Sequence, residues 1–92
     1  KFLEGAPTLI VEILSPGTVR HDRVVKMNRY ARSGVPYYWL ADPVETTLEL
    51  YRLDGSTYRL EASLGPADRH RPLAFPEVEL SMDELFAPLP ED

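Results

Sequence analysis

The sequence predicts an α/β fold with a mixed sheet, in which a parallel βαβ core is extended by an antiparallel hairpin and a short C-terminal helix. Two observations carry this prediction. An apolar run, a helical pattern and a second apolar run follow one another within residues 8–41, and such a unit places its two strands in parallel with a right-handed crossover. Two alternating segments then flank Asp54-Gly55, a strong hairpin turn signal.

The first predicted strand lies in the run Thr8–Leu14, between Pro7 and Ser15-Pro16-Gly17. Its near-continuous apolarity is typical of a strand buried on both faces. Glu12 interrupts that apolarity. A carboxylate there is costly unless it is paired, protonated or bound to a cation, so the group that contacts Glu12 is the best guide to function.

A helix is predicted from about Asp22 to Ser33, with Asp22 as N-cap, Gly34 as a left-handed stop and Pro36 preventing continuation. Three apolar residues share the face that we expect to dock on the sheet: Val24, Met27 and Ala31. Two basic residues lie roughly opposite: Lys26 and Arg29.

The second parallel strand is predicted at Tyr37–Ala41, and the hairpin strands at Thr47–Leu53 and Thr57–Leu64. Strict alternation assigns six hairpin residues to the inward face: Leu48, Leu50, Tyr58, Leu60, Ala62 and Leu64. Gly65–Pro72 reads as a polar loop. Two further elements are expected after it: a short edge strand at Phe75–Leu80 and a capping box at Ser81–Glu84 that opens the terminal helix.

Composition limits the function classes. The chain carries no cysteine, which excludes disulfides and thiolate metal sites and favours the cytoplasm. No run approaches the length of a membrane span, so no membrane partner is expected. The net charge of -5 argues against broad binding to nucleic acid, but residues 20–32 carry five basic side chains against Asp22 alone.

Glu12 and the helix entrance form the strongest candidate site. The crevice of an α/β sheet lies beyond the carboxyl ends of its parallel strands, and the helix that begins near Asp22 returns from that end. Glu12 and Asp22, with Lys26 one turn later, could hold Mg²⁺ or Mn²⁺ and polarise a phosphodiester. The alternative is structural: Glu12 pairs with an Arg, Asp22 is only an N-cap, and Lys26 is its i,i+4 partner. His21 is a weaker candidate, as a proton shuttle.

The run Gly5–Pro16 resembles the signature strand of a large bacterial family, the Uma group of endonuclease-like proteins in the PD-(D/E)xK, restriction-endonuclease-like superfamily. The similarity continues through a spaced set of residues: Asp22, Lys26, Tyr30, Gly34-Val35-Pro36, Tyr38-Trp39 and Asp42-Pro43. It extends more loosely to the hairpin and to Leu85-Phe86. The resemblance implies a restriction-endonuclease-like fold, of which residues 1–92 would be a single partial domain, the C-terminal part.

Members of this superfamily are implied to use an Asp on one strand, then a Glu or Asp and a Lys on the next, around Mg²⁺. By this resemblance Glu12 takes the second acidic position and binds the metal. Leu14 stands where a Lys is usual, and Lys26 would be its migrated replacement. The first Asp would lie upstream of Lys1, and Thr8 replaces an Asp that is common in the family.

The resemblance also implies roles for the helix entrance. Lys26 would orient water or stabilise the charge of the phosphorane, and Asp22 would support Lys26 or a metal-bound water. Three arginines would contact DNA phosphates: Arg20, Arg23 and Arg29.

Three hypotheses follow: a metal-dependent endonuclease acting on DNA, present here as an incomplete part; a catalytically inactive binding or oligomerisation module; and a truncated sheet whose edge pairs with a second copy as a homodimer.

Overall fold

The computed structural model describes residues 7–15 and 20–88 of the chain. Four strands form one sheet, and their order across it follows the sequence. The strands are β1 (Leu9–Ile13), β2 (Tyr37–Asp42), β3 (Thr47–Asp54) and β4 (Thr57–Leu64). β1 and β2 are parallel and joined through helix α1 (Arg20–Arg32), whereas the other two pairs are antiparallel. The predicted βαβ core and hairpin are confirmed.

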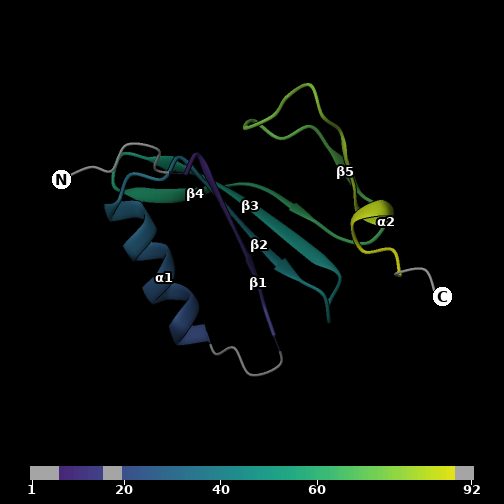
Figure 1. Ribbon diagram of the computed structural model, residues 1–92, viewed down its shortest axis with the longest axis horizontal. Helices are drawn as coiled ribbons and strands as arrows, with labels where there is room; N and C mark the ends of the chain where they lie inside the picture. Colours follow the sequence, from purple (N-terminus) through teal and green to yellow (C-terminus); the bar gives the residue numbers. More distant parts are fainter. Residues whose placement is uncertain (1–6, 16–19, 89–92) are drawn as a thin grey trace.

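The two faces of this sheet carry different layers. Figure 1 shows α1 on one side of the sheet, with β5 (Arg69–His70) and the short helix α2 (Met82–Leu85) on the other. β5 pairs with β6 (Leu80–Ser81) in a small antiparallel sheet of its own. The fold therefore has three layers, with β1–β4 in the middle.

One cluster of buried apolar side chains lies on the face of the sheet away from α1. Strand alternation places Trp39, Leu48 and Leu50 on this face, where they pack with Leu64 and Met82. Leu50 is completely buried, with a relative accessibility of 0%. Burial of these side chains contributes a large apolar term to folding.

Helix α1 differs from its prediction at its start and in part of the face it docks, since Met27 and Ala31 are half-buried as expected but Val24 is exposed. It begins at Arg20, so Asp22 lies within the first turn and is not the N-cap. The side chain of Val24 is largely exposed, whereas Lys26, predicted to lie opposite the docking face, points to the sheet. The physical reason is charge, because the sheet face beneath the helix carries glutamates. At the other end the prediction is confirmed: Gly34 has φ of 78° and its N–H donates to the carbonyl of Ala31.

Strand β1 is not buried on both faces as its apolar run predicts. Val11 is 49% and Ile13 70% exposed. Within the described residues β1 is an end strand of the sheet. Val11 and Ile13 line an open apolar groove of about 390 Å³ together with residues that include Trp39 and Phe86. Apolarity alone does not reveal which strand of a sheet lies at its end.

A β-bulge overturns the predicted inward face of the hairpin. Leu50 pairs with Ala62 but Tyr51 pairs with Leu60, so Glu61 is an extra residue in β4. The alternation is therefore reset at Glu61. Ala62 faces the core, whereas Leu60, on the other side of the bulge, shares the α1 side of the sheet with Tyr51.

The segment after the hairpin also differs from prediction. The polar loop Gly65–Pro72 contains β5. The predicted edge strand Phe75–Leu80 is instead a series of turns, in which the N–H of Phe75 donates to Pro72 and that of Val78 to Phe75, and only Leu80 enters a strand. The capping box is absent, because Ser81 pairs in β6 and its side chain makes no cap hydrogen bond.

No helix in the described part of the chain is long and apolar enough to cross a membrane.

Candidate active site

Glu12 lies in the layer between the sheet and α1, because alternation along β1 turns its side chain toward the helix. The Nζ of Lys26 donates to Glu12 Oε1 at 3.0 Å, and the hydroxyl of Tyr30 donates to Oε2 at 3.2 Å. The Glu12 side chain is 24% exposed. The group that meets this carboxylate within the described residues is therefore an ammonium from α1, not a guanidinium from a neighbouring strand.

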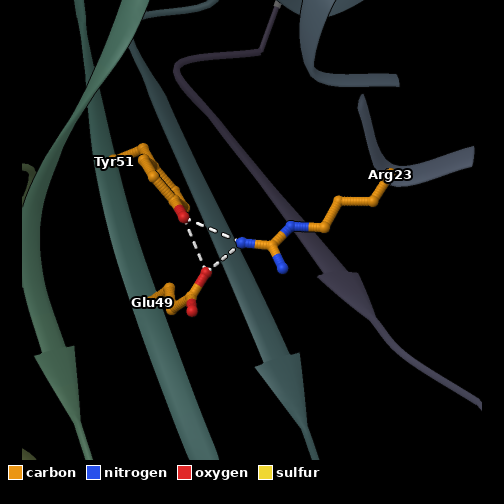
Figure 2. Close-up of polar contacts among 3 residues, drawn as sticks. All are labelled: Arg23, Glu49 and Tyr51. Carbon is orange, nitrogen blue, oxygen red and sulfur yellow. Dashed lines mark hydrogen bonds and ion pairs between the residues drawn. The ribbon is translucent and has the colours of Figure 1, made fainter. Parts of the chain in front are cut away.

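A second ion pair lies in the same layer. Nη2 of Arg23 contacts Oε1 of Glu49 and also donates to the Tyr51 hydroxyl at 2.9 Å. The same hydroxyl donates to Glu49 Oε1 at 2.6 Å. The three side chains form a closed triangle of contacts, with Arg23 reaching from α1 to two residues of β3 (Figure 2).

The two pairs are aligned across the sheet. Glu12 is in register with Leu40 of β2, and Leu40 with Glu49 of β3, so the two carboxylates are about 10 Å apart at their backbones, two strand spacings. On α1, Arg23 and Lys26 are three residues apart and therefore share a face. Two cations from one helix turn thus pair with two anions on one level of the sheet.

Four tyrosines fill the space beside these pairs. The ring of Tyr38 packs against those of Tyr30, Tyr51 and Tyr58, with centroids 5.6, 6.1 and 5.7 Å away. Tyr38 is fully buried, and its hydroxyl has no hydrogen-bond partner among the described residues. Tyr58, by contrast, donates to the carbonyl of Val35 at 2.7 Å.

Burial raises the pKa of all four tyrosine hydroxyls. The pKa of Tyr38 is raised furthest, by burial first and by the Glu12 carboxylate second. Burial and the nearby Tyr30 raise the pKa of Tyr58 to about 12. The pKa of Tyr30 is raised by burial and then by Glu12, and that of Tyr51 by burial and then by its bond to Glu49. These four hydroxyls therefore stay protonated to a higher pH than a tyrosine in water.

The donor set can be compared with what a divalent metal requires. The Glu12 carboxylate is a hard oxygen ligand of the type that Mg²⁺ and Mn²⁺ prefer. Among the side chains that the structure describes, which exclude those of residues 20–22, no group of three or more from His, Cys, Asp or Glu could hold a metal ion. Glu12 therefore fits such a metal in the kind of ligand it offers, and the described residues alone do not complete a ligand set.

The structure brings some of the predicted site residues together and separates others. Glu12 and Lys26 are in direct contact, and Arg23 lies in the same layer. Arg29 lies on the exposed side of α1 and does not join them. Arg20 and Asp22 are in the first turn of α1, and their side chains lie outside the described residues.

Glu49 and Tyr51 were missed by sequence reasoning. Alternation along Thr47–Leu53 places both on the face opposite Leu48 and Leu50, which is the face that Arg23 of α1 contacts. A signal was available: the crossover helix of a βαβ unit must cover one face, and polar residues spaced two apart under a basic helix could pair with it.

The comparisons with known proteins agree with this architecture. The sequence profile of the Uma2 family, described as "Putative restriction endonuclease", matches residues 1–83. A similar solved structure is that of "a putative nuclease belonging to DUF820" from Anabaena variabilis ATCC 29413, with a TM-score of 0.66 and 27% sequence identity. The alignment covers 89% of this chain and 45% of that one, so this chain spans less than half the length of its structural relative. No curated protein matches.

Proposed function

The chain belongs to the Uma2 family, and on this premise we propose that the protein is a metal-dependent endonuclease that hydrolyses DNA phosphodiester bonds at a site containing Glu12 and Lys26. The observation that carries the proposal is the direct contact of Lys26 Nζ with Glu12 Oε1 beneath α1. Phosphodiester hydrolysis needs an anionic metal ligand and a nearby cation for the charge that develops on phosphate. These two side chains provide that combination.

Each proposed catalytic residue has a separate role. Glu12 would hold Mg²⁺ or Mn²⁺ together with ligands from beyond the described residues. The ion would supply Lewis-acid stabilisation of the phosphate charge. Lys26 donates to Glu12 and would stabilise negative charge on the substrate, since its ammonium carries up to three donors. Asp22, one turn before Lys26 on α1, would support the lysine.

Basic residues of α1 would bind the DNA backbone. Arg23 lies in the layer that holds Glu12 and Lys26, which suits it for the phosphate nearest the reaction. Arg29 lies on the exposed side of the helix and would contact a phosphate farther along the strand. Arg20, at the start of α1, completes the proposed set of phosphate contacts.

Plasmid cleavage by the full-length protein tests the proposal. Supercoiled DNA is incubated with the protein and Mg²⁺ or Mn²⁺, and nicked and linear products are followed on a gel. We expect Glu12→Gln and Lys26→Ala each to slow cleavage by about 100-fold or more. The exposed carboxylate of Glu45 provides a matched control, and Glu45→Gln should cleave at the wild-type rate. Cleavage that neither active-site change affects would remove both residues from the mechanism.

A catalytically inactive binding module is the second candidate function. It is favoured by Leu14, which stands two residues after Glu12 where the superfamily usually carries a lysine. Calorimetric titration with Mn²⁺ separates the two. A nuclease should bind the ion in a manner lost in Glu12→Gln, whereas an inactive module should bind DNA with no such ion site and no cleavage.

A further inference from the structure

The triangle formed by Arg23, Glu49 and Tyr51 uses one nitrogen of the guanidinium. The contacts of Arg23 with Glu49 and Tyr51 both involve Nη2, and Figure 2 shows the other terminal nitrogen directed away from these two residues. A guanidinium has five N–H donors in a rigid planar fork. Within the described residues, the donors on Nη1 and Nε of Arg23 therefore remain for another acceptor.

The anchoring also fixes where those donors lie. The Arg23 side chain is 29% exposed and that of Glu49 31%, so the pair is half-buried and still reachable from solvent. Tyr51 accepts from Arg23 and donates to Glu49, which holds the guanidinium plane at one angle. A planar fork that is already oriented loses less freedom when it binds an oxyanion through two parallel hydrogen bonds.

From this geometry we propose that Glu49 and Tyr51 are positioning residues that hold Arg23 ready to bind a non-bridging phosphate oxygen of DNA. The inference deepens the proposed function and rests on it. Arg23 lies one turn from Lys26 on the same face of α1, so a backbone phosphate held by Arg23 lies in the same layer as Glu12. Tyr51 acts through Arg23 and does not itself contact the substrate.

If Glu49 blocked Arg23 instead of positioning it, the expected change in DNA affinity would have the opposite sign. If its carboxylate merely occupied the guanidinium and kept phosphate away, weakening the triangle would release Arg23 and tighten DNA binding. Tyr51→Phe distinguishes the two roles better than Glu49→Gln does, because it removes only the hydroxyl and leaves the net charge unchanged. A change of charge at Glu49 would by itself alter the attraction to DNA.

The test is DNA affinity of the full-length protein in the absence of divalent ions, so that no cleavage occurs. A fluorescein-labelled 20-base-pair duplex is titrated at several salt concentrations and binding is followed by fluorescence anisotropy. We expect Tyr51→Phe to weaken binding about tenfold, as loss of a hydrogen bond to a charged group does. Arg23→Ala should weaken it further and lower the salt slope by about one phosphate contact. Arg29, which is exposed, provides a comparison. In an Arg29→Ala background, Tyr51→Phe should still weaken DNA binding.

The decisive variant is the double substitution Arg23→Ala with Tyr51→Phe. If Tyr51 acts through Arg23, its substitution should have no further effect on affinity once Arg23 is gone. An equal loss in both backgrounds would show a merely structural role and overturn the inference, as would unchanged or tighter binding by Tyr51→Phe. Either result leaves plasmid cleavage and the proposed function standing. A wild-type protein without measurable affinity for the duplex would also overturn the inference, while plasmid cleavage would still judge the proposed function.

Discussion

Two tyrosines of the cluster under α1 should respond in opposite ways to the same substitution. Tyr38→Phe and Tyr58→Phe each remove one hydroxyl from a ring that packs in the same aromatic group. The Tyr38 hydroxyl is buried without a partner among the described residues, whereas that of Tyr58 donates to Val35 at 2.7 Å. We expect Tyr38→Phe to raise the free energy of unfolding and Tyr58→Phe to lower it.

The magnitudes follow from the hydrogen-bonding state of each hydroxyl. A buried hydroxyl without a partner costs about 1–3 kcal/mol of desolvation, so its removal should stabilise the protein by about 1 kcal/mol. Loss of the Tyr58 bond deprives the carbonyl of Val35, a residue only 3% exposed, of its hydrogen bond from that hydroxyl. That loss should cost about 1–2 kcal/mol, so the two variants should differ by about 2–3 kcal/mol.

Urea unfolding followed by far-UV circular dichroism measures both values, since the slope against urea reports whether the unfolding reaction is unchanged. Thermal melts should show the same order, with a shift of about 4–8 °C for each kcal/mol in a domain of this size. A Tyr38→Phe variant that is destabilised as much as Tyr58→Phe would refute the reasoning. It would mean that the Tyr38 hydroxyl makes a stabilising bond in the folded protein.

Alkaline pH and the Glu61 side chain give two more predictions. The pKa of Tyr58 is raised from 10.0 to about 12. The contribution of its protonated hydroxyl to the free energy of unfolding is therefore present below pH 10 and lost as pH rises toward 12. Unfolding at a series of pH values should show this decline, and the decline should be smaller in Tyr58→Phe. Glu61 is 6% exposed at its side chain, accepts from the N–H of Leu73 at 3.0 Å and contacts His70 Nε2 at 2.8 Å. Glu61→Ala should therefore lower the free energy of unfolding by about 1–3 kcal/mol, with Glu45→Ala near zero, and equal values would contradict the assignment.

Much of the fold could be predicted because each regular element has a local signal. The Asp54-Gly55 turn, where Gly55 has φ of 66°, sets the hairpin, and Gly34 ends α1 at a φ that favours glycine. The parallel pairing of β1 and β2 follows from the helix between them. These features depend on residues close together in sequence.

The errors share a different origin, since each depends on a partner that is distant in sequence. Lys26 and Arg23 face the sheet because glutamates of β1 and β3 lie there, and no helical periodicity contains that information. Ser81 satisfies backbone pairing with Arg69 in place of capping α2. The bulge at Glu61 goes with contacts of its carboxylate to His70 and to the N–H of Leu73, and a pattern of alternating residues contains no information on these distant partners.

The polar contacts under α1 could be predicted only in part, for the same reason. The sequence singled out Glu12, because a carboxylate in an apolar strand demands a partner, and Lys26 because it follows one turn into the helix. It did not find Glu49 or Tyr51, which lie at ordinary polar positions of a hairpin strand and acquire their significance when α1 covers them.

The extra residue in β4 determines where the chain could be shortened. Because Ala62 already pairs with Leu50 and Leu60 with Tyr51, deletion of Glu61 would leave both halves of the strand facing their present layers. A deletion elsewhere in the strand would turn one half over. The sheet is complete without Glu61, and what the insertion adds is a carboxylate that fastens the chain around Leu73 to the hairpin. The one-residue bulge thus provides a side chain that connects the four-stranded sheet to the small two-stranded sheet.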